Sequence, residues 1–287
     1  MRINHGGISG GKDSTALLLW MRYESGYPLE SLRFTFCDTG NESPETLAYV
    51  QFLSENVHPI ETIRPELDFY ELAMKNHRFP STKARFCTTE LKLKPTQKHT
   101  LALIEEYGDV LLHSGIRRAE SPARAKQTEE YVTDPYFDCD VRRPLLGWSI
   151  GDVWAIHNRY NIRRNPLYDM GMSRVGCYPC VMCRKEEIGR IALRDPERIK
   201  FLERMEAEVA VASPRGEATF FPPSKTPARF TSKDWTREKD GKVFRLSTVA
   251  DVARWGMESP DVWQEDLDLD EIDAQGRSCP SMLGVCE

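Results

Sequence analysis

Short apolar runs alternate with amphipathic stretches through the first half of the chain. Runs typical of buried strands cover residues 3–8, 32–37, 60–63, 109–114 and 141–146. Helical spacing marks the stretches between them, at residues 16–21, 43–53, 69–74 and 88–106, the last interrupted near Pro95. Strands that alternate with helices predict an α/β fold with a doubly wound, parallel sheet of five strands. Ligands of such a sheet bind at the carboxyl ends of its strands.

The second half of the chain predicts helices and then a less regular extension. Helical patterns cover residues 186–192, 196–212 and 248–255. Residues 213–232 are rich in proline, lysine and arginine and show no period, as in an extended segment or a boundary. We therefore expect an α/β domain over residues 1–165, a cysteine-containing helical segment over 166–212, and a C-terminal extension with an acidic tail over 213–287.

The composition is typical of a soluble globular protein. Hydrophobic residues make up 40% and charged residues 29% of the 287 positions. No apolar run reaches the roughly 18 residues that a membrane-spanning helix needs, and the N-terminus leads into a strand without a signal peptide's apolar core. We expect a cytoplasmic protein with no membrane association. In that compartment, eight cysteines favour metal or redox chemistry over disulfides.

Charge is unevenly distributed along the chain, although the net value is only −5. Acidic residues gather between positions 258 and 273. Basic residues gather in the middle of the chain, at Arg78, Lys83, Arg85, Lys92, Lys94, Lys98, Arg117, Arg118, Arg124, Lys126, Arg142, Arg143, Arg159, Arg163 and Arg164. Basic segments beside a nucleotide site could bind the nucleotide, a polyanionic substrate or both. The alternative is that many of them are solvated helix faces.

A glycine-rich turn joins the first predicted strand to the first predicted helix. It reads Ser9-Gly10-Gly11-Lys12-Asp13-Ser14. Its glycines let the backbone approach a ligand, and the helix start presents unpaired N–H groups, so the turn predicts an anion site, most plausibly for phosphate. Gly6 and Gly11-Lys12 nearly complete a nucleoside triphosphatase P-loop, but Asp13 stands where a hydroxyl would hold magnesium. The alternative is a structural turn, for which adjacent Lys12 and Asp13 are a poor choice.

Two further polar segments follow predicted strands and share this edge of the sheet. Asp38 and Thr39 come after the second strand, and Gly115 begins a segment after the fourth. The latter carries Arg117, Arg118 and Arg124, whose guanidinium groups suit bidentate binding of phosphate or sulfate oxygens. Salt bridges to Glu120 and Glu129 are the competing role.

Three cysteines lie within one short turn, Cys177-x-x-Cys180-x-x-Cys183. Three closely spaced thiolates with a distant fourth ligand suit a [4Fe–4S] cluster or a tetrahedral zinc ion. The alternative is that the thiols are unliganded and pack as small hydrophobic groups. Cys279 and Cys286, near the end of the chain, could be alternative ligands, a sulfur or redox relay, or uninvolved thiols.

Taken together, these segments form an ordered series of motifs. Besides the glycine-rich turn they are Asp38-Thr39-Gly40, Glu45-Thr46, Cys87-Thr88-x-Glu90-Leu91-Lys92-x-x-Pro95, Gly115-Ile116-Arg117-x-x-Glu120-Ser121, Asn165-Pro166-Leu167-Tyr168 and Gly176-Cys177-Tyr178-Pro179-Cys180. Over about residues 3–205 the series resembles the phosphoadenosine phosphosulfate reductase superfamily. The turn itself resembles the loop of ATP pyrophosphatases, which cleave ATP between the α and β phosphates and leave an adenylated intermediate.

The resemblance implies an adenine nucleotide alpha hydrolase-like, Rossmann-like fold that binds ATP and Mg²⁺. It implies that Ser9, Gly11, Lys12 and Ser14 hold the phosphates while Asp13 helps to bind magnesium. We expect Lys12, Asp13 and Arg117 to be catalytic. The other expected ATP contacts are Gly10, Asp38, Thr39, Gly115, Arg118 and Arg124.

Cys87 lies in a motif whose family counterpart meets the cysteine turn. Related enzymes of sulfate reduction and DNA phosphorothioation carry [4Fe–4S], so iron on Cys87, Cys177, Cys180 and Cys183 is favoured over Zn²⁺.

Three functions are compatible with these motifs. The first is an ATP pyrophosphatase that adenylates an acceptor, with nucleic acid expected as the acceptor and a cysteine desulfurase as the sulfur donor, as in DNA phosphorothioation or tRNA thiolation. The second is a sulfonucleotide reductase, and the third is a non-catalytic nucleotide-binding module. The intact Lys12-Asp13 pair favours the first, since the reductases tend to lack it. Cys279 and Cys286 also do not lie in the reductases' Glu-Cys-Gly-Leu-His motif. We further expect a homo-oligomer.

Overall fold

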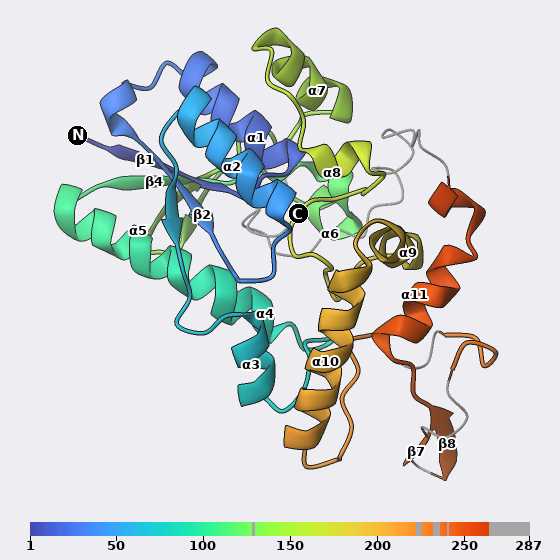
Figure 1. The fold of residues 1–287 in the computed structure, drawn as a ribbon. Coiled ribbons are helices and arrows are strands. Elements are labelled where there is room, and N and C mark those ends of the chain that lie inside the picture. The colour runs from blue at the N-terminus through green and yellow to red at the C-terminus, as the bar shows by residue number, and fades with distance from the viewer. Residues whose placement is uncertain (128–129, 222–225, 232–235, 240, 264–287) are drawn as a thin grey trace.

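A six-stranded sheet forms the centre of the molecule (Figure 1). The computed structural model describes residues 1–127, 130–221, 226–231, 236–239 and 241–263. The strands are β1 (Ile3–Ile8), β2 (Leu32–Cys37), β3 (Glu61–Ile63), β4 (Val110–His113), β5 (Tyr131–Asp134) and β6 (Cys139–Arg142), in the order β3-β2-β1-β4-β6-β5. All neighbouring pairs are parallel except β5 and β6.

The five predicted parallel strands are therefore confirmed, and β5 is an additional antiparallel edge strand. The predicted fifth strand was placed too far along the chain, because β6 ends at Arg142. Two residues later stands Pro144, which has no N–H to donate to a ladder. β5 escaped the sequence pattern because it is a short edge strand without a buried side chain.

Helices cover both faces of the sheet. One face carries α1 (Lys12–Leu19), which continues as a π-helical turn (Trp20–Glu24), α2 (Pro44–Asn56) and α7 (Ile150–Arg159). Their apolar side chains share one core with β1 and β2. The other face carries α5 (Lys94–Tyr107), whose Leu103 packs with Ile3 and Val110. The fold is thus doubly wound, as predicted.

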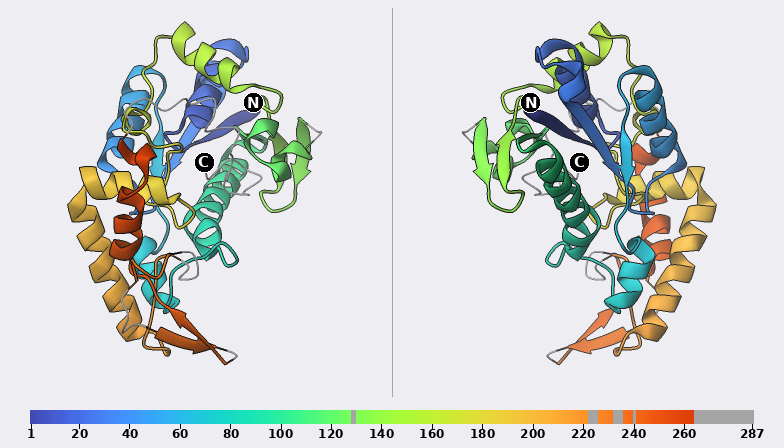
Figure 2. Two further views of the ribbon diagram at one scale, coloured as in Figure 1. Left: turned by 90° about the vertical axis from the view of Figure 1, so that its right-hand side faces the viewer. Right: turned by 90° about the vertical axis from the view of Figure 1, so that its left-hand side faces the viewer.

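The C-terminal helices form a second core beyond the carboxyl edge of the sheet (Figures 1 and 2). They are α8 (Pro166–Asp169), α9 (Lys185–Arg194), α10 (Pro196–Ala212) and α11 (Val249–Met257), and they pack with α3 (Phe69–Lys75). Helices α9 and α11 cross closely because Gly189 faces Gly256. A Cβ atom on Gly189 would lie 2.6 Å from the carbonyl carbon of Gly256.

Short elements complete the described chain. They are the 3-10 turns Leu29–Ser31, Arg118–Glu120 and Pro260–Trp263, helix α4 (Phe86–Thr88), a π-helical turn (Thr89–Leu93), α6 (Pro122–Ala125) and a hairpin of β7 (Thr236–Lys239) and β8 (Lys242–Arg245). The predicted helix over residues 88–106 is present, but in place of the expected interruption near Pro95 the π-helical turn passes directly into α5, with Pro95 in its first turn. None of the helices in the described ranges is long and apolar enough to cross a membrane.

The chain order creates a switch point between β1 and β4. From β1 the chain moves outward through β2 and β3, then returns to place β4 on the other side of β1. The loops that leave β1 and β4 therefore diverge from adjacent strand ends, which is where doubly wound sheets bind ligands. Gly115 allows the two loops to approach, because a Cβ atom there would lie 3.3 Å from the carbonyl oxygen of Asp13.

Candidate functional site

The glycine-rich turn, Ser9–Ser14, links β1 to the N-terminus of α1. Gly10 adopts a φ of +79°, and a Cβ atom there would lie 3.1 Å from Cγ2 of Thr46, so both conformation and space require glycine. The Ser9 and Ser14 hydroxyls lie 3.0 Å apart, and the Ser14 hydroxyl donates to the Gly11 carbonyl oxygen over 3.1 Å. The two serines therefore hold the shape of this turn, which we call the phosphate loop.

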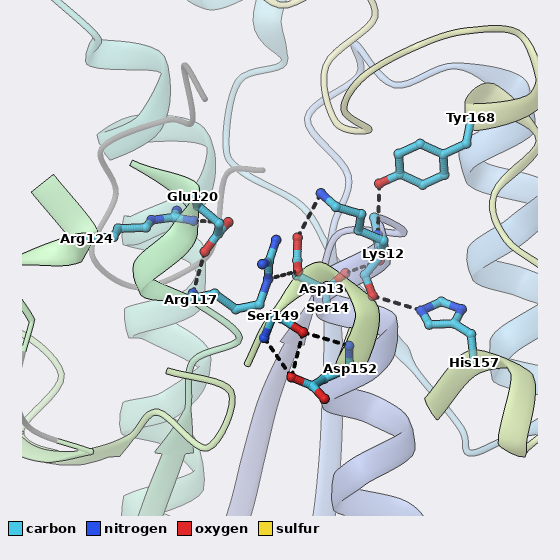
Figure 3. A network of polar contacts seen from close by, with 11 residues as sticks. Lys12, Asp13, Ser14, Arg117, Glu120, Arg124, Ser149, Asp152, His157 and Tyr168 are labelled. Atoms are coloured by element: carbon cyan, nitrogen blue, oxygen red, sulfur yellow. Dashed lines mark hydrogen bonds and ion pairs between the residues drawn. The ribbon is translucent and has the colours of Figure 1, made fainter. Parts of the chain in front are cut away.

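Lys12, Asp13 and Arg117 form a buried ion-paired group at the start of α1 (Figure 3). Nζ of Lys12 lies 3.1 Å from Oδ2 of Asp13, and Nε of Arg117 binds Oδ1. Asp13 is 1% exposed and Arg117 is fully buried. Burial opposes ionisation, but Lys12 and Arg117 outweigh it and hold the pKa of Asp13 below its ordinary value. The carboxylate is therefore ionised and shared by two cations.

Glu120 and Arg124 extend this group on the Arg117 side. Glu120 pairs with the buried Arg124 guanidinium and also accepts the backbone N–H of Arg117. Burial, followed by the nearby Asp13 charge, raises the pKa of Glu120, and Arg124 partly opposes this. The cluster therefore contains two carboxylates, of Asp13 and Glu120, and three cationic side chains, of Lys12, Arg117 and Arg124. Such a cluster suits an additional anion.

Three of the other predicted ATP contacts, Arg118, Asp38 and Thr39, lie outside this cluster. Arg118 is exposed and donates from Nε to the Gln127 carbonyl oxygen over 2.7 Å. Asp38 pairs with Arg64 over 3.0 Å. Thr39 is fully buried, and its hydroxyl donates to Glu42 over 2.7 Å. The pairing of Arg124 with Glu120 fits the competing salt-bridge role, while Glu129 lies outside the described residues.

A pocket separates the phosphate loop from the cysteine turn. It is lined by the carboxyl ends of β1 and β2, by Glu42 and Lys92, and by Gly176. On its far side the cysteine turn is tied to the loop after β2. The two form a β-bridge between Glu42 and Cys177, and the Tyr178 N–H donates to the Asn41 carbonyl oxygen over 2.6 Å. This pocket therefore lies between Ser9 of the phosphate loop and Gly176, which directly precedes the cysteine turn.

The four predicted cysteine ligands lie near one another. Burial raises the pKa of Cys177 to about 12, and Cys180 and Cys87 contribute as neighbouring groups. Burial, followed by Glu187 and Cys180, also raises the pKa of Cys183. The donor chemistry fits a soft metal, because a cation would offset the repulsion among four thiolates. In the part of the chain that the structure describes, however, no three His, Cys, Asp or Glu side chains are arranged to hold a metal ion.

Three residues that the sequence analysis does not assign to the site hold the phosphate loop. The Tyr168 hydroxyl accepts the Lys12 N–H over 2.9 Å, and His157 Nε2 donates to the Lys12 carbonyl oxygen over 2.9 Å. Asn165 donates to the Gly10 carbonyl oxygen over 3.1 Å. Figure 3 shows Tyr168 and His157 on the opposite side of Lys12 from Arg117. Asn165 and Tyr168 lie in a motif named above, whereas nothing in the sequence marks His157.

Comparison with known proteins decides the family. Residues 7–183 match the phosphoadenosine phosphosulfate reductase domain. The chain belongs to this family. All the predicted site residues lie within the matched range, from Ser9 to Cys183.

Relatives of this phosphoadenosine phosphosulfate reductase-family chain occur in phage, archaea and bacteria. An uncharacterized 37.8 kDa protein of Escherichia phage 186 is 34% identical over an alignment that covers 99% of this chain and 97% of that protein. Protein MJ0066 of Methanocaldococcus jannaschii is 30% identical over 73% of this chain, but the chain spans only 42% of that protein. Adenosine 5'-phosphosulfate reductase 2 of Bacillus subtilis is 28% identical over 51% of this chain and 61% of its own length.

Solved structures show more distant likeness. Phosphoadenylyl-sulfate reductase from Candida auris, a phosphate complex, has 17% identity and a TM-score of 0.46 over 61% of this chain and 81% of that one. FMN adenylyltransferase from Candida glabrata, with FMN and an ATP analog, has 17% identity and a TM-score of 0.41 over 61% and 53%. The family assignment rests on the sequence match and not on these superpositions.

Proposed function

We propose that this protein is an ATP pyrophosphatase that cleaves ATP to AMP and pyrophosphate and so activates an acceptor for sulfur incorporation. The observation that carries the proposal is the buried group of Lys12, Asp13 and Arg117 at the N-terminus of α1, on the sheet's switch point. A helix N-terminus and an excess of cationic side chains suit a polyphosphate. Family membership is compatible with this reaction and does not by itself select it.

In the proposed reaction an acceptor oxygen attacks the α-phosphorus, the α–β anhydride bond breaks, and pyrophosphate leaves. Lys12 and Arg117 would stabilise the charge that develops on the leaving group. Asp13 would hold both cations in place before ATP binds. Sulfur from a partner, such as a cysteine desulfurase, would then displace AMP from the acceptor.

Magnesium and an iron–sulfur cluster are the proposed cofactors. Asp13 fits a magnesium ligand because its carboxylate is ionised, and the ion would supply further charge neutralisation to the phosphates. Cys87, Cys177, Cys180 and Cys183 are the proposed ligands of a [4Fe–4S] cluster, with Zn²⁺ as the alternative. Either would fix the cysteine turn against α4 and would offset the charge of the thiolate ligands.

A nucleic acid is the proposed acceptor. Support comes from a second pocket, at the C-terminal ends of α3 and α10, that is lined by His77, Arg78 and Arg215 among other residues. Glu217 also lines this pocket. Arg78 and Arg215 are exposed, and among the described residues neither has a carboxylate within ion-pair distance. Such cations suit phosphodiester groups. A homo-oligomer stays part of the proposal.

A sulfonucleotide reductase is the second candidate, because the Bacillus relatives are named adenosine 5'-phosphosulfate reductases. It would use an adenylyl sulfate in place of ATP and would release sulfite. The two candidates therefore differ in substrate and in product.

Product analysis tests the proposal. The anaerobically purified protein is incubated with ATP and Mg²⁺, with and without DNA or tRNA, and AMP, ADP, pyrophosphate and orthophosphate are separated. We expect pyrophosphate, with AMP appearing where water in place of the sulfur donor displaces the adenylyl group; both should be strongly reduced in Lys12→Gln and unchanged in Lys200→Gln, which alters an exposed lysine of α10. Formation of ADP and orthophosphate would contradict the mechanism. Release of sulfite from adenylyl sulfate with a thiol reductant, without turnover of ATP, would favour the reductase.

A further inference from the structure

The phosphate loop is held by side chains that lie far from it in the sequence. Asn165, Tyr168 and His157 bind Gly10 and Lys12 across 155, 156 and 145 residues. Each of the three is nearly buried, with 1% of Asn165, 4% of Tyr168 and 2% of His157 exposed. These contacts therefore form in a site from which water is largely excluded.

The contacts fix both backbone groups of one residue. The N–H of Lys12 donates to the Tyr168 hydroxyl, and the carbonyl oxygen of Lys12 accepts from His157. The N–H groups of a first helical turn have no partner within the helix, so the Tyr168 hydroxyl satisfies a group that would otherwise be unpaired. With both peptide groups held, the directions in which Lys12 and Asp13 project are also set.

The residues that hold the loop are themselves held. Trp154 packs edge-on against the Tyr168 ring at 5.7 Å and contacts the His157 ring at 5.2 Å. Asn165 also accepts the Leu167 N–H over 3.0 Å, which caps α8. Burial lowers the pKa of His157, which is consistent with a neutral ring that donates one hydrogen bond.

We propose that Tyr168, His157 and Asn165 are positioning residues that fix the phosphate loop in its binding conformation before nucleotide arrives. They act through the backbone of Gly10 and Lys12 and need not touch the substrate. Because the loop is already ordered, it loses less conformational entropy when the phosphates bind. The catalytic part of this inference rests on the proposed function, whereas the effect on the loop does not.

Removal of the Tyr168 hydroxyl is the direct test, and the chain offers a matched control. Tyr49 is 1% exposed, and its hydroxyl donates to the Arg163 carbonyl oxygen over 2.7 Å, away from the loop. Tyr168→Phe and Tyr49→Phe thus delete the same atom and the same kind of bond. We expect Tyr168→Phe to lower the rate constant kcat for pyrophosphate release about tenfold, with a smaller change in KM. Tyr49→Phe should leave both unchanged.

Amide hydrogen exchange supplies a readout that needs no activity. Without nucleotide, the Lys12 amide should exchange about fivefold faster in Tyr168→Phe than in the wild type or Tyr49→Phe. His157→Ala should also speed loop exchange, and His157→Gln, which keeps a donor, should restore part of the protection. Unchanged exchange in Tyr168→Phe would overturn the inference, as would equal losses of activity in the two Tyr→Phe variants. Altered exchange in a protein without ATP turnover would instead uphold it and reject the proposed function.

Discussion

The phosphate loop region and the cysteine region treat buried ionisable groups in opposite ways. At the loop, burial coexists with charge, because Asp13 lies against Lys12 and Arg117 and its pKa is held below the ordinary value. In the cysteine region burial suppresses charge. It raises the pKa of Cys177 to about 12 and that of Glu206, on α10, to about 8. Glu206 accepts the backbone N–H groups of Phe220 and Val249.

The two regions also differ in whether a bound ligand is needed to set their geometry. The loop region contains its own counter-charges, so its geometry forms without a ligand. In the cysteine region burial disfavours the thiolate form, so we expect a bound cation to stabilise the ligand arrangement there. We therefore expect the loop to tolerate loss of the metal, and the cysteine turn not to.

Loss of one thiol should have the largest effect. Cys180→Ala, purified anaerobically, should lose its bound iron and visible absorbance, because a cluster needs all four ligands. Cys139→Ala, which changes a buried cysteine of β6, should retain both. Metal analysis and absorbance spectra check this. Full iron content in Cys180→Ala would show that Cys180 is not a ligand. A colourless wild type that contains zinc would show that the metal is zinc and not an iron–sulfur cluster.

Removal of the Asp13 charge should destabilise the loop region and lower its activity. Asp13→Asn leaves Lys12 and Arg117 without their shared carboxylate, and loss of one partner from a buried ion pair costs about 3–5 kcal/mol. We expect a loss of pyrophosphate release of at least about 100-fold and a lower melting temperature. The control is Asp140→Asn, an exposed carboxylate that pairs with Arg2. Equal behaviour of the two variants in activity assays and calorimetry would show that the buried group is not needed.

The pH dependence of stability should distinguish the two carboxylates. The folded-state pKa of Glu206 is raised from 4.5 to about 8, so its stabilising contribution is present below pH 4.5 and is lost as pH rises through 8. The free energy of unfolding should fall by about 5 kcal/mol over that window. Asp13, whose pKa is lowered, should contribute above its unfolded pKa and lose its contribution as pH falls.

Denaturant titrations between pH 4 and 9 test this difference. Glu206→Gln should flatten the profile in the alkaline half, even though the amide keeps only one of two acceptor oxygens. Glu55→Gln, at an exposed site on α2, should follow the wild-type profile. A wild-type slope that is unaffected by Glu206→Gln would assign the pH dependence to other groups.

A steric change at the switch point should have the smallest effect. Gly115→Ala adds a methyl group 3.3 Å from the Asp13 carbonyl oxygen, so one of the two loops must shift by a few tenths of an ångström. We expect about 1 kcal/mol of lost stability and a several-fold loss of activity. Gly147→Ala enters open space and should change neither. Thermal unfolding and product release, measured side by side, would show whether the approach of these loops matters.

Local sequence signals were sufficient for the scaffold and for the phosphate loop. Apolar runs marked the five parallel strands, and the glycine-rich turn lies between β1 and α1 as the pattern indicates. Only a few strand orders are possible, because neighbouring parallel strands must be joined by crossover connections such as helices. The prediction failed at two places near the edge of the sheet. It missed β5, which lacks buried side chains, and it ended β6 too late, since Pro144 follows the strand closely.

Contacts across long sequence separations could not be predicted. The sequence placed Arg117, Arg118 and Arg124 at one edge, but only the fold shows that Arg117 reaches Asp13 while Arg118 turns toward Gln127. His157 binds the loop because α7 packs on α1, and a single histidine in a helix carries no such signal. Cys279 and Cys286 lie outside the described residues.

A crystal structure with a non-hydrolysable ATP analogue and Mg²⁺ tests the central proposal most directly. We expect the β and γ phosphates at the N-terminus of α1, contacted by Lys12 and Arg117, with the α-phosphorus facing the pocket beside Glu42. An analogue bound elsewhere, or one whose γ-phosphorus faces the pocket, would contradict it.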